Sequence, residues 1–337
     1  SRALRLELPL LEMRNTDMAM SCGGCAAEVH AVRLRGEPEM AWMGDMCYAP
    51  RLRQLSAIRP VDAHRGVWLL SGGLGGLALR GAVMFASYDA HLVMASRSGR
   101  VAHAGQGLES QLKALGPVAT MVTCDICDCG QATALAAGCT PLWGLVHAAG
   151  VLHDGPVQRM DNRSVGAVFA PKARGASFLH TSSAQVAIEA AVALSSTAAT
   201  FGNLGQGNYA AANAAIDSLT HRRRGCGLLA SSLQPTNVSE VGMAAAANEV
   251  GKHTQAWSLG LEQYVACLRR AVMQCESGIL VPLPTDVNEM AELTDTNVWT
   301  HICMQRLMAE LAPQPIALEA VHADKVMHTF DVTFTAK

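Results

Sequence analysis

The fold of this chain is constrained most strongly by six short, mainly apolar segments that alternate with alanine-rich stretches compatible with helices. These segments occupy residues 67–70, 91–96, 118–124, 142–147, 192–195 and 228–233. Strands that are apolar on both faces belong to a sheet covered on both sides, and helices between them connect such strands in parallel. Residues 66–285 are therefore predicted to form an α/β domain with a doubly wound parallel sheet.

The two ends of the chain have a different texture. Residues 1–65 contain an imperfect apolar/polar alternation, typical of strands, on either side of a turn at 35–38. A small β-rich subdomain is expected there. Residues 286–337 are expected to form a C-terminal extension whose role the sequence does not reveal. In and just before this extension the pattern predicts a helix at 261–274, a strand at 278–282, a helical stretch at 302–311 and a strand at 326–334.

Composition excludes several classes of protein. Of the 337 residues, 50% are hydrophobic and 16% are charged, which supplies a packed core and excludes a mainly disordered chain. No apolar run approaches the ~18 residues that a membrane-spanning helix needs. A net charge of -2 and an aromatic content of 4% argue against a nucleic-acid binder, which uses basic surfaces and aromatic stacking. The sequence predicts a globular protein without a transmembrane segment.

The cysteines indicate the compartment. Eleven of them, an odd number, are spread over the chain, which fits a reducing compartment (the cytoplasm or an organelle such as a plastid) better than a disulfide framework. The pairs Cys22–Cys25 and Cys124–Cys127 are far apart in the sequence, so free thiols are expected and no metal site. The chain begins at Ser1 and shows no secretory signal, which predicts a processed product or a piece of a longer protein.

A glycine cluster follows the first apolar segment. Its members are Gly72, Gly73, Leu74, Gly75 and Gly76. Glycine suits a tight turn with positive φ and allows the backbone to approach a pyrophosphate, while the next helix directs its first amides at the phosphates. A tight turn without a ligand is the alternative. Because the cluster lies between the first strand and the first helix of an α/β series, a dinucleotide site is favoured.

The residues after the second predicted strand indicate which dinucleotide binds. Ser96, Arg97 and Ser98 occupy the place where an NAD-selective enzyme usually has Asp or Glu for the ribose 2′-hydroxyl. A cation suits a 2′-phosphate instead, so NADPH is favoured over NADH. A solvated surface arginine is the alternative interpretation.

Two further strand ends complete the predicted cofactor edge. Asp125 and Ile126 follow the third strand, where the Asp125 carboxylate could accept a hydrogen bond from the adenine amino group. Ala148, Ala149 and Gly150 follow the fourth strand, where small residues would let the nicotinamide ribose lie against the backbone. Open α/β sheets bind ligands at this edge.

Four polar residues are candidates for catalysis. Reduction of a carbonyl requires a proton on oxygen, and the Tyr209 phenol can supply it if a nearby cation lowers its pKa from ~10. Ser196, at the end of the fifth strand, can hydrogen-bond the same oxygen. Asn213 lies one helical turn after Tyr209 and faces the same side. The chain has only five lysines, and Lys172 is the one that stands out within the α/β region.

Five stretches of the sequence carry a resemblance to a known family. They are residues 72–76, 96–99, 147–152, 171–175 and 205–214. In residue type and spacing they resemble the ketoreductase domain of modular polyketide synthases, which belongs to the short-chain dehydrogenase/reductase superfamily. The resemblance covers roughly residues 40–285. It implies a Rossmann-like sheet of that superfamily's type, preceded by a truncated structural subdomain that binds no cofactor.

The resemblance also implies a role for each catalytic candidate. Tyr209 donates the proton, and Ser196 orients the carbonyl and Tyr209. Lys172, 37 residues before Tyr209, lowers the Tyr209 pKa and contacts the nicotinamide ribose, while Asn213 positions Lys172 or a water. The expected reaction is NADPH-dependent reduction of a β-ketoacyl thioester, carried on the phosphopantetheine arm of an acyl carrier protein, to a β-hydroxyacyl thioester.

The substrate side shows agreement with the family and departures from it. Asp154, Asn208 and the absence of tryptophan at Phe201 resemble members that give the D-hydroxy product, whereas Leu204, where proline is usual, does not. Met243 matches the segment that closes over the site. Residues 234–237, Gln-Pro-Thr-Asn, replace a usual Trp-Gly pair, so the grip on the substrate is expected to differ.

Two other functions stay open. A reductase-derived scaffold subunit of a larger assembly is one, although a scaffold has no physical need of an intact catalytic set. A stand-alone reductase of free small ketones is the other, and dependence on a carrier protein would discriminate. The basic run at residues 221–224 is either a solvated helix end or a docking site for an acidic carrier protein.

Overall fold

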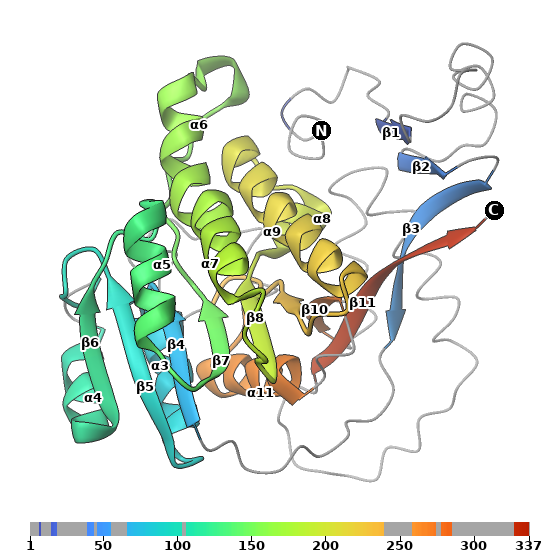
Figure 1. Cartoon of the computed structure of the whole chain (residues 1–337). Helices are drawn as coiled ribbons and strands as arrows, with labels where there is room; N and C mark the ends of the chain where they lie inside the picture. The colour runs from blue at the N-terminus through green and yellow to red at the C-terminus, as the bar shows by residue number, and fades with distance from the viewer. Residues whose placement is uncertain are drawn as a thin grey trace, which may run out of the picture.

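Seven parallel strands form the centre of the molecule (Figure 1). A computed structural model describes residues 7, 15–18, 39–43, 46–54, 66–102, 106–238, 258–273, 278–284 and 327–336. Along the sheet the strands follow the order β6-β5-β4-β7-β8-β9-β10. They are β4 (Gly66–Ser71), β5 (Ala90–Ser96), β6 (Ala119–Thr123), β7 (Leu142–His147), β8 (Ala190–Leu194), β9 (Ser231–Leu233) and β10 (Ile279–Pro284). The order reverses between β4 and β7, where open α/β sheets bind ligands.

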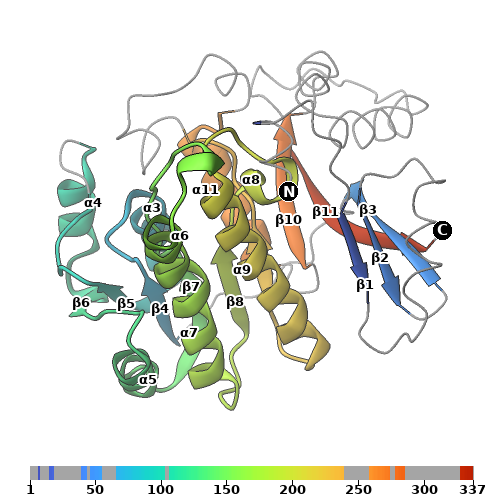
Figure 2. The same cartoon turned by 90° about the horizontal axis from the view of Figure 1, so that it is seen from above.

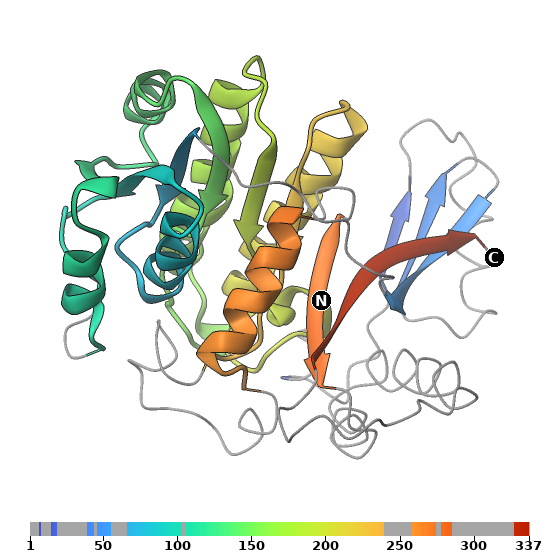
Figure 3. The same cartoon turned by 90° about the horizontal axis from the view of Figure 1, so that it is seen from below.

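Helices cover both faces of this sheet, as Figure 3 shows. One face carries α3 (Gly76–Ala86), α4 (Leu108–Leu115) and α11 (Leu261–Met273). The other carries α5 (Cys129–Gly138), α7 (Gly175–Ser183) and α9 (Gly207–Gly225). The predicted Rossmann-like doubly wound fold is confirmed. The main difference lies at β9, which begins three residues later than the apolar run at 228–233.

Four more strands extend the sheet beyond β10. Strand β11 (Met327–Ala336) pairs antiparallel with β10 and, along its other edge, with β3 (Met46–Gln54). Strand β2 (Glu39–Met43) pairs antiparallel with β3, and β1 (Asn15–Met18) pairs parallel with β2. In Figure 2 these outer strands lie to one side of the helix-covered sheet. The C-terminal extension, for which the sequence indicated no role, thus supplies β11, the strand that lies between β10 and the N-terminal strand β3.

Some expectations fall outside the described residues. The helical stretch at 302–311, the alternating segment at 29–34 and the turn at 35–38 belong to this group. The division of the chain at residues 65 and 285 stays a prediction. Among the described helices, none has both the length and the apolar character needed to cross a membrane.

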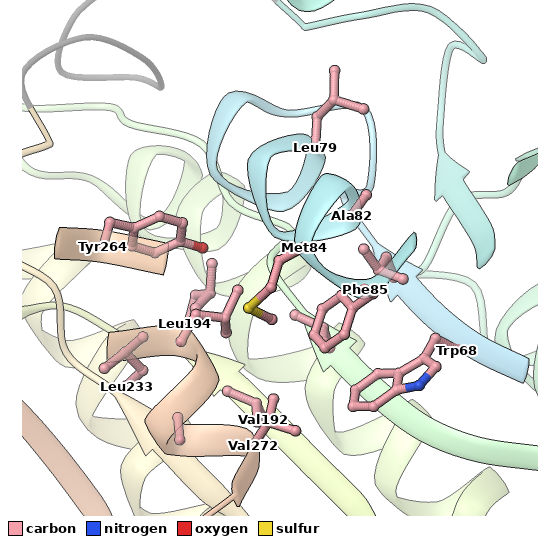
Figure 4. Close-up of a cluster of buried hydrophobic side chains, with 14 of the residues drawn as sticks. Trp68, Leu79, Ala82, Met84, Phe85, Val192, Leu194, Leu233, Tyr264 and Val272 are labelled. Atoms are coloured by element: carbon pink, nitrogen blue, oxygen red, sulfur yellow. The ribbon is translucent and has the colours of Figure 1, made fainter. Parts of the chain in front are cut away.

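An aromatic pair forms part of the core between the sheet and helices α3 and α11 (Figure 4). Trp68 on β4 and Phe85 on α3 are both fully buried, and their rings stack with centroids 4.1 Å apart. Tyr264 of α11 is also fully buried and donates a hydrogen bond from its hydroxyl to the Leu77 carbonyl (3.1 Å). The core therefore packs β4 against α3, and α11, from the C-terminal part of the domain, against α3.

Removal of the Trp68 ring tests this packing. We expect Trp68→Ala to lower the free energy of unfolding by about 3–5 kcal/mol, because the cavity left between β4 and α3 cannot collapse completely. The matched control is Met121→Ala on β6, where the side chain is 53% exposed and a loss below about 0.5 kcal/mol is expected. Urea unfolding measures both variants, and equal losses would contradict the packing described here.

Candidate active site

The loops after β4 and β7 lie against each other at the carboxyl edge of the sheet. Gly72 has φ +68°, and a Cβ added there would lie 2.6 Å from the backbone nitrogen of Ala149. The Ala148 amide donates to the Ser71 carbonyl (2.9 Å), which joins the two loops directly. Glycine is therefore required at position 72 both by the backbone conformation and by the approach of the second loop.

The glycine cluster fits a dinucleotide phosphate. Helix α3 starts at Gly76, and its N-cap, Gly75, provides no side-chain hydrogen bond to the first amides. A Cβ at Gly73 would lie 2.7 Å from the Leu70 carbonyl oxygen, so the turn passes through a space that admits no side chain. Backbone amides at the start of a helix, exposed by a glycine turn, are suited to binding an anion.

The residues predicted to bind the adenosine half lie on turns after β5 and β6. Ser96 Oγ accepts from the Gly99 amide (3.0 Å) and Ser98 Oγ accepts from the Arg100 amide (3.2 Å), which leaves the Arg97 side chain exposed between them. Asp125 Oδ1 accepts from the Cys127 amide (3.0 Å).

Ile126 and the segment 148–150 have different surroundings. Ile126 is buried in the core against Gly175 of α7, where a Cβ would meet its methyl group at 2.9 Å. The side chains at positions 148–150 are partly exposed at the edge of the sheet. Cofactor contacts at these positions stay a prediction.

Lys172 enters the site from a distorted helix. Helix α6 (Asn162–Phe169) continues through a π-helical turn, η3 (Ala170–Arg174), into α7. Pro171 within the turn has no N–H to donate, and such π turns often occur at functional sites. The Lys172 side chain is 3% exposed. The turn therefore directs an ammonium group into the interior.

Two groups contact the Lys172 ammonium, and a glycine leaves room for its side chain. Its Nζ donates to the Leu194 carbonyl at the end of β8 (3.0 Å) and lies 5.1 Å from the centroid of the Tyr209 ring. A Cβ at Gly150 would lie 2.8 Å from Lys172 Cε. Glycine at position 150 therefore provides the space that the lysine stem occupies.

A buried histidine fixes the backbone of the same turn. His147 Nε2 lies 2.9 Å from the Lys172 carbonyl oxygen, and its Nδ1 lies 2.6 Å from Ser71 Oγ. A carbonyl only accepts, so Nε2 carries the proton and Ser71 donates to Nδ1. Burial, reinforced by the nearby Lys172 charge, lowers the pKa of His147 to about 4. His147 is therefore a neutral link between β4, β7 and the lysine turn.

Ser196, Tyr209 and Asn213 come together at the junction of two helices. Ser196 is the N-cap of α8 (Thr197–Phe201), and its Oγ accepts from the Ala198 amide (3.2 Å). Tyr209 lies in the first turn of α9. Asn213 is fully buried and donates from Nδ2 to the Tyr209 carbonyl (2.8 Å), while its Oδ1 has no hydrogen-bond partner among the described residues. The structure thus brings together all four predicted catalytic residues.

One electrostatic expectation is corrected by the structure. Lys172 was expected to lower the pKa of Tyr209, but that pKa is raised, because burial of the phenolate outweighs the hydrogen-bonding influence of Asn213 and Ser196. Burial also lowers the pKa of Lys172 to about 8, partly offset by the Asp217 carboxylate. At neutral pH the phenol therefore keeps its proton and the ammonium keeps most of its charge.

The predicted substrate-side residues differ in their surroundings. Asp154 Oδ2 accepts from Gln206 Nε2 (2.7 Å) at an exposed position. Asn208 is buried and donates from Nδ2 to the His153 carbonyl (2.9 Å), which holds the loop after β7 against α9. Met243 lies outside the described residues. Contact of these residues with a substrate stays a prediction.

Sequence reasoning missed several residues around the site. The Glu7 carboxylate accepts from the Val157 and Gly205 amides (2.6 and 3.1 Å), which joins two loops beside Asp154. Asp217 lies one further helical turn after Asn213, a spacing that could have revealed it. No group of three or more His, Cys, Asp or Glu side chains suited to a metal ion occurs in the part of the chain that the structure describes.

Fold and site together define a nicotinamide-dependent oxidoreductase of the short-chain dehydrogenase/reductase superfamily. The family model described as "KR domain" matches residues 66–240, which is more than half of the chain. The chain therefore belongs to the ketoreductase (KR) domain family of polyketide synthases.

Individual relatives agree with this assignment. Polyketide synthase GfsA from Streptomyces halstedii is 41% identical over 210 residues, which cover 60% of this chain and 3% of that protein. The pikromycin polyketide synthase component PikAII from Streptomyces venezuelae is 36% identical over 234 residues, which cover 66% of this chain and 6% of that protein. The chain thus spans a few per cent of the length of these synthases.

Solved structures show the same fold. A structure of A-type ketoreductases from a modular polyketide synthase superimposes with a TM-score of 0.78 at 29% identity, covering 88% of this chain and 65% of that chain. The first ketoreductase of the tylosin polyketide synthase superimposes with a TM-score of 0.74 at 26% identity, covering 90% of this chain and 69% of that chain.

Titration of Lys172 tests the electrostatics of the site. We expect its ammonium to lose the proton at a pH near 8, well below the ~10.4 of a solvated lysine. With only five lysines, NMR of protein labelled with ¹³C at lysine Cε resolves the signals, and Lys172→Met assigns the one that disappears. A midpoint at the ordinary value of a solvated lysine would contradict the burial described above.

Proposed function

We propose that this domain reduces the keto group of a β-ketoacyl thioester to a β-hydroxyacyl thioester, with NADPH as the reductant. The substrate would be carried on the phosphopantetheine arm of an acyl carrier protein within a polyketide synthase. The observation that carries the proposal is the position of the Lys172 ammonium over the Tyr209 ring, with Ser196 at the adjoining helix end. A structural or scaffold role would not require this arrangement.

Different residues of the site would bind different parts of the cofactor. The glycine turn at 72–76 would hold the pyrophosphate, and Arg97 would pair with the 2′-phosphate. Asp125 would contact the adenine, and Lys172 the nicotinamide ribose at the edge formed by residues 148–150. When bound, NADPH supplies a hydride to the carbonyl carbon.

Tyr209 supplies the proton that the reduced oxygen needs. The raised pKa of Tyr209 keeps the phenol protonated at neutral pH, which is the form required of a donor. As the proton leaves, the Lys172 ammonium stabilises the phenolate that forms beside it. Ser196 Oγ donates a hydrogen bond to the carbonyl oxygen while negative charge develops there. The orphaned Asn213 Oδ1 can accept from a water that returns a proton to Tyr209.

Replacement of the Tyr209 hydroxyl tests its role. We expect Tyr209→Phe to lower kcat for NADPH oxidation with a β-ketoacyl thioester surrogate by about 10²- to 10⁴-fold, the contribution of a positioned general acid. Tyr264→Phe is the control, because that tyrosine is fully buried and its hydroxyl bonds to the Leu77 carbonyl in the core. Unchanged activity in Tyr209→Phe would remove this residue from its proposed role, and an inactive wild type would favour the scaffold alternative.

Removal of the Arg97 guanidinium tests the choice of cofactor. We expect Arg97→Ala to weaken NADPH binding about tenfold or more and NADH binding little, because a charge-assisted hydrogen bond to a phosphate is worth ~1.5–3 kcal/mol. Arg100→Ala removes an exposed cation three residues along the same turn and should affect the two cofactors alike. Fluorescence titration gives the dissociation constants. Equal losses for both cofactors in Arg97→Ala would refute the 2′-phosphate assignment.

A further inference from the structure

We propose that Asp217 is a positioning residue of the proposed reductase, acting as the buried counter-charge of Lys172 and as the link that joins the Ser196 helix to the Tyr209 helix. The inference rests on the proposed function and adds a residue that acts through the catalytic groups. It explains why the chain buries a carboxylate behind its catalytic groups.

A continuous hydrogen-bonded chain surrounds the Asp217 carboxylate. Thr200 Oγ1 donates to Gln234 Oε1 (2.6 Å), and Gln234 Nε2 donates to Asp217 Oδ2 (2.8 Å). Ser232 Oγ donates to the other carboxylate oxygen, Oδ1 (2.6 Å). Each of these four residues is less than 9% exposed. The direction of the chain makes Asp217 an acceptor at both oxygens, so the network is suited to the ionised carboxylate.

This network connects the elements that carry the catalytic groups. Helix α8 has Ser196 at its N-cap and Thr200 four residues later, on the side that meets Gln234. Helix α9 carries Tyr209, Asn213 and Asp217 at four-residue spacing, so all three lie on one face. Gln234 follows β9 and bonds to both helices. Gln234 therefore joins α8 to α9. These bonds restrain the distance between Ser196, at the start of α8, and Tyr209, in the first turn of α9.

The hydrogen bonds place the Asp217 carboxylate near Lys172. Lys172 Nζ bonds to the Leu194 carbonyl, and Leu194 pairs with Leu233 on the adjacent strand β9. The residues on either side of Leu233, Ser232 and Gln234, both bond to Asp217.

A lysine as deeply buried as Lys172 tends to lose its proton, and the Asp217 carboxylate opposes that loss. Within the described part of the chain, the other groups that contact Lys172 are uncharged at neutral pH. His147 on β7 is neutral, Tyr209 on α9 is protonated, and β8 contributes the Leu194 carbonyl. Asp217 therefore extends the pH range in which Lys172 stays an ammonium ion.

Gln234, a member of this network, belongs to a segment that already stood out in the sequence. It opens the segment 234–237, which departs from the family pattern and for which a different grip on the substrate was expected. In the structure its side chain is 1% exposed and bonds to Asp217 and Thr200. The departure therefore supplies an amide to the interior and contributes to the positioning of the catalytic helices.

Substitution of Asp217 by its amide tests the proposal. We expect Asp217→Asn to shift the Lys172 titration, followed by NMR of the labelled lysines, to lower pH by about one unit or more. The alkaline limb of the kcat/KM profile should move in the same direction. Thr200→Val is the matched control, because it breaks the same network but leaves the carboxylate. Its Lys172 midpoint should stay at the wild-type value even if turnover falls.

The two variants distinguish the effect of the Asp217 charge from the effect of breaking the hydrogen-bond network. An unchanged Lys172 midpoint in folded Asp217→Asn, or an equal shift in Thr200→Val, would overturn the proposal. If Asp217→Asn does not fold, the double variant Asp217→Asn/Gln234→Glu returns a carboxylate to the network. A midpoint restored towards the wild-type value then supports the proposal, and one that stays low overturns it. The NMR readout needs no turnover, so its result is distinguishable from failure of the proposed reaction.

Discussion

The burial of the Lys172 ammonium beside Tyr209 is the interaction on which the rest of the site depends. Removal of an ammonium ion from water is costly unless polar groups replace the lost hydration. The Leu194 carbonyl provides one such group, the Tyr209 ring face another, and the Asp217 carboxylate a longer-range one. Gly150 provides space for the side chain. Together these features stabilise a positive charge on Lys172 beside Tyr209.

The two central groups of the site have linked requirements. A proton donor must hold its proton before reaction, and its conjugate base must be stabilised afterwards. Burial satisfies the first requirement, since it raises the pKa of Tyr209. The adjacent ammonium satisfies the second, provided that it remains charged, and burial favours the loss of its proton. The hydrophobic surroundings and the carboxylate behind Lys172 therefore act in opposite directions, and their balance sets the pH range of the site.

Much of the fold followed from local patterns, whereas the electrostatics did not. Apolar runs predicted the parallel strands because a strand buried on both faces must be apolar, and the helical spacing of Tyr209 and Asn213 predicted their shared face. The direction of the Tyr209 pKa was wrong because desolvation depends on the whole surrounding fold. Segment 234–237 was interpreted only as a change in the grip on the substrate, because the partner of Gln234, Asp217, lies 17 residues earlier in the chain. The pairing of β11 with β3 was likewise invisible, since it joins segments from opposite ends of the chain.

Chemical rescue of a Lys172→Ala variant tests the central claim most directly. Truncation leaves a cavity beside Tyr209 in which a short alkylammonium ion can replace the lost group. If Lys172 acts through its charge, turnover of a β-ketoacyl thioester falls in the variant. Added ethylamine then restores it in proportion to the protonated amine, while ethanol of similar size does not. Full turnover in Lys172→Ala without amine, or equal rescue by the neutral alcohol, would contradict the assignment of an ammonium ion to this position.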